Sequence, residues 1–313
     1  MKLLPNTVAL PEELERAGKI AYRALELALD VVQEGELLLE IAERIEKFVL
    51  SQGAAPAFPV NISVNEVAAH YSPRVDDEAR VPPDSLVKVD VGVHVNGFIA
   101  DAAVSIALNK QWENLIKASR EALASALQRV RHAVPVNEVA RAIEARIRSL
   151  GYNPVKNLTG HKIERYNLHA GKSVPNVPAL EYSTVKMLTG EIYAIEPFAT
   201  AGRGVVVERG PSHIYRVVSV KRIPGDSDLN ALLEELWRRY KGLPFSERWL
   251  HREGFSLRDL QRLVEVGRVY HYPRLVEVSG GYVSQHEDTV VVSKDGCSPI
   301  VRVLELYHSA HKA

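Results

Sequence analysis

Two aspartates, Asp90 and Asp101, are placed by the sequence on one face of a hairpin. They lie in V-K-V-D-V-G-V-H-V-N-G-F-I-A-D-A-A-V-S, residues 87–105, where Asn96 and Gly97 separate two alternating runs. This dipeptide favours a two-residue type I′ turn, because both central residues of that turn need a positive φ. The turn makes the two carboxylates diagonal neighbours about 7–8 Å apart. Carboxylates that share a face repel each other unless a proton or a bound cation lies between them, so the pair is a candidate cation site.

The opposite face of the hairpin is predicted to be apolar, since Val89, Val91 and Val93 alternate with the residues of the acidic face. A solvated sheet face that carries two unrelated acids is the alternative interpretation. Gly92 favours a site instead, because it lies opposite Asp101 and leaves room for a ligand or a metal at the sheet surface.

Further polar residues lie in strand-like settings in the second half. His161 follows a glycine in N-L-T-G-H-K-I-E, and His169 comes eight residues later in Y-N-L-H-A-G. Glu196 lies in an apolar strand, where a carboxylate is rarely tolerated without a partner. Glu287 and Asp288 precede another apolar strand. Each histidine alone is equally a loop residue held by the backbone, but two Asp, two Glu and one or two His together favour a dinuclear metal site with bridging carboxylates.

The composition excludes several kinds of function. Lys+Arg and Asp+Glu both number 39 in 313 residues, so we expect no nucleic acid and no anionic membrane as partner, and a small or neutral substrate. The single cysteine, Cys297, excludes an internal disulfide framework and a thiolate zinc cluster. The start, M-K-L-L-P-N-T, lacks the apolar stretch of a signal peptide, and no apolar run approaches a membrane span. We therefore expect a cytoplasmic protein, and the many Arg and Glu beside few Met are typical of a thermophilic source.

Two helix pairs are expected to position these residues. Apolar spacing predicts the helices at residues 11–34, 36–51, 111–132 and 136–150. An offset of 98 residues aligns the second pair with the first, including Gly53 with Gly151 and Pro56 with Pro154, although amphipathic helices also produce such matches by chance. The repeat predicts a pseudo-symmetric α+β domain in which two helix pairs cover one face of a sheet. The other, concave face would carry Asp90 and Asp101.

A helical segment at residues 225–272 interrupts this pattern. It contains eight acidic and eight basic residues, and this balance argues against a nucleic-acid-binding module. We interpret the segment as a subdomain that flanks the site.

Six stretches of the chain, in the same order, resemble the methionine aminopeptidases and, among them, the type II group found in archaea. They lie within residues 58–292 and are F-P-V-N-I-S-V-N-E-V-A-A-H-Y, V-D-V-G-V-H-V-N-G-F-I-A-D, N-L-T-G-H-K-I-E, L-H-A-G, A-I-E-P-F-A-T and Q-H-E-D-T. The resemblance implies the pita-bread fold, with a curved, mostly antiparallel sheet, as a single catalytic domain over residues 1–313. It also implies that residues 225–272 are the helical insertion typical of type II.

The resemblance assigns roles to ten residues. The implied metal ligands are Asp90, Asp101, His161, Glu196 and Glu287, of which Asp101 and Glu287 would bridge two divalent ions. The implied catalytic residues are Glu196, His70 and His169, and the implied substrate-binding residues are His70, His169, Phe58, Pro59 and Tyr272. The donor set accepts Fe, Mn, Co, Zn or Ni, and the sequence does not decide between them.

The implied reaction is removal of an N-terminal methionine when the second residue is small. A hydroxide shared by the two ions would attack the scissile carbonyl, and Glu196 would move its proton to the leaving amine. His169 would stabilise the oxyanion and His70 would position the peptide. The expected partners are the N-termini of nascent polypeptides near the ribosome, and we expect a monomer.

One stretch departs from the family pattern. Most methionine aminopeptidases have Q-F-E-H-T where this chain has His286 and Asp288 around Glu287. Asp288 is similar to what prolidases carry and is expected to add negative charge beside the metals, whereas strand alternation points His286 away from them.

Two alternative functions are considered. An X-Pro aminopeptidase or prolidase of the same fold usually has a domain before the core, whereas the first core helix here begins near residue 11. A non-catalytic pita-bread binding module would have lost its metal ligands, whereas all five are present.

Overall fold

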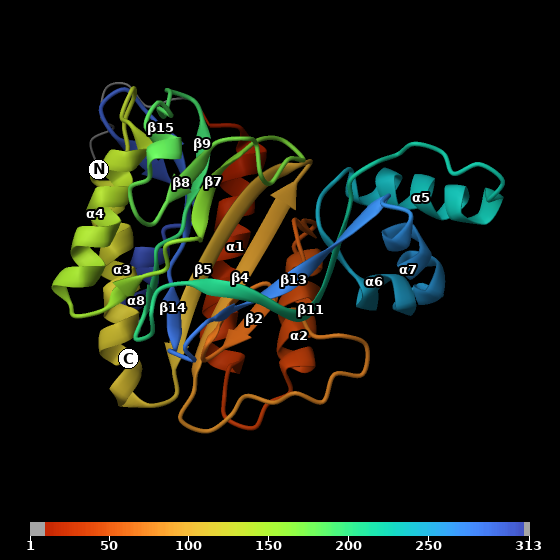
Figure 1. Ribbon diagram of the computed structural model, residues 1–313, viewed down its shortest axis with the longest axis horizontal. Coiled ribbons are helices and arrows are strands. Elements are labelled where there is room, and N and C mark those ends of the chain that lie inside the picture. The colour runs from red at the N-terminus through yellow and green to blue at the C-terminus, as the bar shows by residue number, and fades with distance from the viewer. Residues whose placement is uncertain (1–9, 310–313) are drawn as a thin grey trace.

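The two halves of the chain form matching layers of helix on sheet. The computed structural model describes residues 10–309. The four long helices are α1 (Glu12–Val31), α2 (Leu38–Ser51), α3 (Glu113–Leu127) and α4 (Val136–Ser149). Figure 1 shows α1 and α2 behind the strands β4 and β5, with α3 and α4 along one side. The predicted two helix pairs are therefore confirmed.

The predicted repeat is visible in the bounds of these elements. α2 and α4 are 98 residues apart at both ends, from 38 to 136 and from 51 to 149. The short strands β1 (Ala55–Pro56) and β6 (Asn153–Pro154) keep the same offset. Gly53 and Gly151 end the two helices with φ of 68° and 84°, a left-handed conformation that glycine adopts at little cost.

The predicted hairpin is confirmed to the residue. β4 (Leu86–Val95) and β5 (Phe98–Ala107) are antiparallel, and Gly92 is paired with Asp101. Asn96 and Gly97 have φ of 50° and 86°, as a type I′ turn requires. The valines of its apolar face pack against α1 and α2.

All strand pairs between named strands in residues 10–309 are antiparallel. The first half contributes β2 (Asn61–Val64), which pairs with β4, and β3 (Val67–Ala69). The second half contributes β7 (Thr159–Ile163), β8 (Ser173–Pro175), β9 (Ile192–Ile195), β10 (Phe198–Thr200), β14 (Val283–Gln285), β15 (Asp288–Val292) and β16 (Cys297–Pro299). β11 (Val206–Val217) and β13 (Val269–Glu277) form a long pair that crosses in front of the hairpin in Figure 1.

The two halves meet between β5 and β15. A single bridge pairs Ala103 with Glu287, and each residue donates its backbone N–H to the carbonyl of the other. The Thr289 hydroxyl also accepts from the backbone N–H of Asp101 at 2.7 Å and donates to its carbonyl at 2.8 Å. The predicted α+β architecture, with helix pairs on a mostly antiparallel sheet, is confirmed.

A group of three helices lies at one end of the molecule (Figure 1). It comprises α5 (Ser227–Tyr240), α6 (Glu247–Arg252) and α7 (Leu257–Glu265), with the short strand β12 (Phe245–Ser246). These helices share an apolar cluster with Tyr215 and Val217 of β11 and Val269 of β13. The interpretation of residues 225–272 as an insertion stays a prediction.

A buried ion pair joins α6 to α2. Arg248 and Glu46 are each only 3% exposed, and two guanidinium nitrogens donate to the two carboxylate oxygens at 3.1 and 2.9 Å. The same carboxylate accepts from Trp249 Nε1 and from the backbone N–H of Val60, while Arg248 Nε donates to the Pro73 carbonyl. The ion pair therefore fixes the helical group to α2, and its hydrogen bonds reach the chain at Val60 and at Pro73.

Among residues 10–309, no helix has the combination of length and apolar character needed to cross a membrane. The last described helix, α8 (Val303–Ser309), follows β16.

Candidate active site

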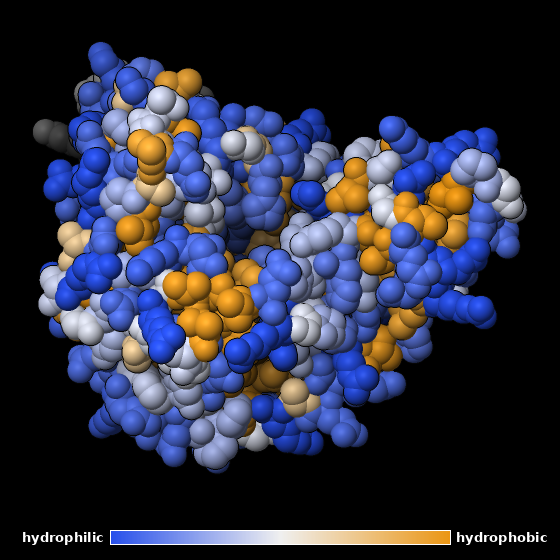
Figure 2. All heavy atoms as spheres, in the orientation of Figure 1, coloured by the Kyte–Doolittle hydropathy of each residue, from blue (hydrophilic) through white to orange (hydrophobic). Residues whose placement is uncertain are grey.

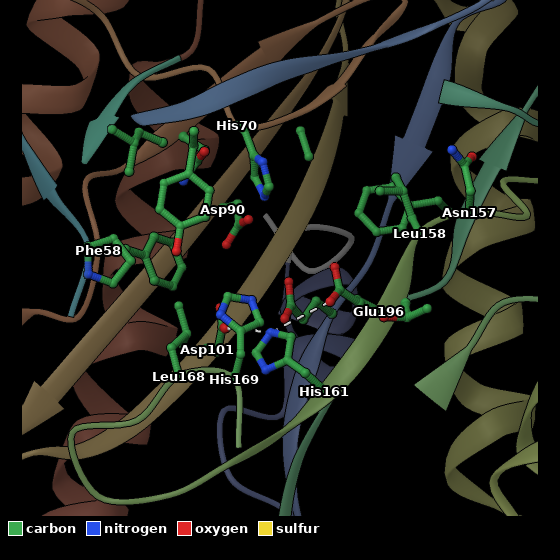
Figure 3. Close-up of a pocket in the computed structure, with 18 residues that line it drawn as sticks. Phe58, His70, Asp90, Asp101, Asn157, Leu158, His161, Leu168, His169 and Glu196 are labelled. Atoms are coloured by element: carbon green, nitrogen blue, oxygen red, sulfur yellow. Dashed lines mark ion pairs between the residues drawn. The ribbon is translucent and has the colours of Figure 1, made fainter. Parts of the chain in front are cut away.

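The predicted site residues, except Pro59, line one cavity of about 240 Å³. The nine residues come from both halves of the chain and are Phe58, His70, Asp90, Asp101, His161, His169, Glu196, Tyr272 and Glu287. The surface is hollowed near the centre of the face shown in Figure 2. In Figure 3 the labelled acids and histidines among them point toward one another.

Five different strands or strand ends position the five predicted metal ligands. Asp90 lies in β4, Asp101 in β5 and His161 in β7. Glu196 follows β9 directly, and Glu287 lies between β14 and β15. Side chains alternate along a strand, so the hairpin register by itself directs both aspartates to the same face.

The ligand-type atoms converge closely. His161 Nε2 lies 3.6 Å from Asp101 Oδ2 and 3.7 Å from Glu196 Oε1. Three potential ligand atoms lie within 4.8 Å of one another, one from each of Asp101, His161 and Glu287. Gln285 Nε2 donates to Glu287 Oε2 at 3.0 Å and orients that carboxylate.

Simultaneous ionisation of the four carboxyl groups of the cavity is strongly unfavourable. Burial raises the pKa of Asp90 to about 7. Burial, and secondly the charge of Asp90, raises the pKa of Asp101 well above its usual range. Burial, followed by the charges of neighbouring acids, does the same for the pKa of Glu196 and of Glu287. Such a cluster needs protons or cations to be stable.

Two carboxylate oxygens support a cation. Asp90 Oδ1 and Asp101 Oδ1 are buried and have no hydrogen-bond partner within the described part of the chain. Buried oxygens of this kind are costly unless something positive satisfies them. Carboxylates with one imidazole are donors that several divalent transition metals accept. The residues therefore fit a divalent metal centre.

The three histidines of the cavity are neutral. Burial lowers the pKa of His161 and of His70 to about 4, and burial with the neighbouring His161 lowers the pKa of His169 further. The His169 ring lies 4.3 Å from the His161 ring, and the His70 ring meets the Tyr272 ring edge-on at 5.5 Å. His70 has a φ of 61°, a strained conformation for a non-glycine residue and one that is enriched at functional sites.

Two details of the predicted pocket differ from the structure. The space left by Gly92 is filled by the ring of Phe58, since a Cβ on Gly92 would lie 2.3 Å from Phe58 Cε1. Gly92 therefore makes room for a cavity-lining side chain, and its role as an opening for a ligand or metal is corrected. Pro59 is buried outside the cavity, and its carbonyl accepts from Asn61 Nδ2 at 2.9 Å.

The expectation that Asp288 adds charge beside the metals is wrong. Asp288 points away from the cavity, and its two oxygens accept the backbone N–H groups of Val301 and Val303 at 3.0 and 2.8 Å, at the start of α8. His286 also points away, as predicted, and its Nδ1 lies 2.8 Å from the Ser119 hydroxyl on α3. The feature that suggested a prolidase is thus explained by the attachment of α8.

Sequence reasoning missed several lining residues. Asn61 is paired with Asp90 across β2 and β4, and its Oδ1 is buried without a hydrogen-bond partner among residues 10–309. Its place in F-P-V-N, next to predicted pocket residues, is the signal that was available. Asn157 and Leu158 also line the cavity, on the side opposite Phe58 in Figure 3, and nothing local in the sequence indicated them.

Comparison with known proteins agrees with this geometry. The model of metallopeptidase family M24 matches residues 12–294. The methionine aminopeptidase of Pyrococcus abyssi is 44% identical to this chain over 290 residues, which cover 91% of this chain and 97% of that protein. The predicted resemblance to archaeal methionine aminopeptidases is confirmed.

Solved structures share the fold at lower identity. A crystal structure of methionine aminopeptidase from Thermotoga maritima has a TM-score of 0.67 and 20% identity, covering 95% of this chain and 99% of that one. The structure of a thermophilic Arx1 has a TM-score of 0.79 and 16% identity, covering 93% of this chain and 91% of that one. These likenesses confirm the predicted pita-bread fold. By its sequence and its fold together, the chain belongs to metallopeptidase family M24.

Proposed function

We propose that this protein removes the N-terminal methionine from polypeptides, using two divalent metal ions. The observation that carries the proposal is the convergence of four carboxylates and one imidazole in a single cavity, where Asp101, Glu287 and His161 are buried and Asp90 and Glu196 are half-buried. The substrate is proposed from the relatives, which are named methionine aminopeptidase. We also propose a monomer as the active unit.

Asp90, Asp101, His161, Glu196 and Glu287 would hold the ions. When bound, the ions supply a nucleophilic water near neutral pH and polarise the carbonyl of the scissile bond. The orphaned oxygens of the two aspartates support this ligand set.

Glu196 is the proposed proton carrier. Its carboxylate lies within the acidic cluster, where burial, followed by the charges of Asp101 and Asp90, raises its pKa and so favours the uptake of a proton. Glu196 accepts a proton on a carboxylate oxygen and delivers it to the leaving amine, as a general acid–base requires.

His169 and His70 act as neutral hydrogen-bond donors. Each neutral imidazole carries one N–H that it can donate to a substrate oxygen. We propose that His169 stabilises the developing oxyanion and that His70 positions the peptide. The strained backbone of His70 is consistent with a side chain held in one orientation for this purpose.

The apolar wall of the cavity would receive the methionine side chain. Phe58, Leu168, Ile214 and Tyr272 line it together with Phe198. A cavity of about 240 Å³ is small for a ligand site, so it holds the end of a chain and favours a small second residue. We propose the N-termini of nascent polypeptides as substrates, because they are chain ends that begin with methionine. We also propose that residues 225–272 are the insertion that closes one side of the cavity.

The experiment is release of free methionine from Met-Gly-Met-Met, compared with cleavage of X-Pro-Phe peptides. Chelated protein is refilled separately with Fe(II), Mn(II), Co(II), Zn(II) or Ni(II). We expect cleavage of the methionyl peptide alone, with a loss of at least about 100-fold in Glu196→Gln and in Asp101→Asn. Glu265→Gln, on the surface of α7, is the matched control and keeps full activity. Preference for X-Pro peptides would refute the substrate, and metal binding without any turnover would refute the enzymatic function.

A further inference from the structure

The guanidinium of Arg216, on β11, has no hydrogen-bond or ion-pair partner in the described part of the chain. Its Nε is buried and donates to no acceptor within residues 10–309, and no carboxylate there forms an ion pair with its guanidinium. Arg248, by contrast, has all of its guanidinium nitrogens occupied by Glu46 and its neighbours. A half-buried arginine whose Nε has no protein acceptor needs a ligand or a water molecule to supply one.

The register of β11 directs Arg216 to the cavity side of the sheet. Ile214, two residues earlier, lines the cavity, and alternation puts Arg216 on the same face. Tyr215 between them faces the opposite way, into the apolar cluster of the helical group. In Figure 1, β11 and β13 run from the hairpin toward that group.

The neighbours of Arg216 connect it to the substrate residues. It is paired with Tyr270 on β13, and the Tyr270 ring lies 5.0 Å from the ring of Tyr272, which lines the cavity. The positive charge of Arg216 also contributes to lowering the pKa of His169, after burial and two histidines. Arg216 is therefore near the histidine that is proposed to act at the scissile carbonyl.

We propose that Arg216 is a specificity-determining residue that binds a carboxylate of the substrate on the leaving-group side of the cleaved bond. This inference rests on the proposed function, because that function determines the direction in which the peptide substrate lies in the cavity. Guanidinium groups hold carboxylates through paired, charge-assisted hydrogen bonds, and the acceptor is either an acidic side chain or the terminal carboxylate of a short peptide. The residues after the methionine are thus selected for negative charge.

The test compares matched acid and neutral substrates with the metal-loaded protein. The dipeptide Met-Ala is compared with its amide for the terminal carboxylate, and Met-Ala-Glu amide with Met-Ala-Gln amide for the side chain. We expect kcat/KM to favour one or both acids by about tenfold, as a charge-assisted hydrogen bond provides. Arg216→Met abolishes the preference, and Arg216→Lys restores part of it because the charge is kept. Arg258→Met, an exposed arginine on α7, removes the same net charge and keeps the wild-type preference.

Each outcome separates this inference from the proposed function. Cleavage of all methionyl peptides without any acid preference, or a preference that survives in Arg216→Met, overturns the role of Arg216 and leaves the proposed function intact. If no methionyl peptide is cleaved, the proposed function fails. Calorimetric Kd values of the same acid and amide pairs then decide the inference: tighter acid binding that needs Arg216 supports it, and equal values overturn it.

Discussion

Substituting Asp90 by asparagine is predicted to have opposite effects on stability with and without metal. Burial raises the pKa of Asp90 from 3.8 to about 7 in the metal-free protein. An acid whose pKa is raised on folding contributes its full stability below its unfolded pKa, and the contribution is lost as the pH rises through the folded value. A factor of ten in an equilibrium constant is about 1.4 kcal/mol. Asp90 therefore costs the metal-free protein about 4 kcal/mol between pH 4 and pH 7.

Asparagine has nearly the same shape and does not ionise. Without metal, raising the pH from 4 to 7 should increase the free energy of unfolding of Asp90→Asn by about 4 kcal/mol relative to that of wild type. With metal, the ion satisfies the orphaned oxygen of Asp90, so the same substitution should lower the stability at pH 7. The assay is urea unfolding at both pH values, in chelator and in saturating metal.

Asp288→Asn is the matched control, because burial also raises the pKa of Asp288 to about 7 but its oxygens accept backbone N–H groups outside the cavity. Its effect should be the same with and without metal. Equal pH dependence of unfolding in metal-free wild type and metal-free Asp90→Asn would refute the reasoning.

Three further substitutions test the surroundings of the site. Arg248→Met leaves the carboxylate of Glu46 buried and unpaired, and should lower the free energy of unfolding by about 3–5 kcal/mol in urea titrations. Gly92→Ala puts a methyl group 2.3 Å from the Phe58 ring, so it should cost about 1–3 kcal/mol of stability and lower kcat/KM for methionyl peptides. Asp288→Ala leaves two backbone donors without their acceptor and should cost about 1–3 kcal/mol, while kcat/KM changes less than about twofold.

Each of these three predictions would be contradicted by a specific result. Full stability of Arg248→Met would mean that the ion pair does not fix the helical group. Gly296→Ala, where an added Cβ meets nothing within 4 Å, is the control for glycine replacement, and equal kinetics in both glycine variants would argue against the packing of Phe58. A large loss of kcat/KM in Asp288→Ala, with folding intact, would return Asp288 to the metal site.

Local patterns predicted the parts of the fold that depend on local interactions. Asn96 and Gly97 determine the turn, alternation determines the faces, and the two together are sufficient to predict the pairing of Gly92 with Asp101. Apolar spacing predicted both helix pairs, and the offset of 98 residues predicted that the second pair repeats the first. Periodicity does not determine where a helix ends, so the first predicted helix continued to residue 34 whereas α1 ends at Val31.

The parts of the site that depend on tertiary packing were not accessible in this way. Alternation, which placed His286 correctly, also directs Asp288 away from Glu287. The role of Asp288 as an acceptor, however, depends on the start of α8 lying beside it in space. The ring of Phe58 fills the space of Gly92 only because the segment after β1 lies across the sheet. Likewise, the lack of a partner for Arg216 depends on which acids surround it in space.

The most direct test of the account is whether methionine release follows bound metal. Metal content by elemental analysis and release of methionine from Met-Gly-Met-Met are measured on the same samples, from fully chelated to saturated protein. We expect no release without metal, release that rises with metal content, and loss of both metal and activity in Asp101→Asn. Full activity of the chelated protein, or of Asp101→Asn, would contradict it.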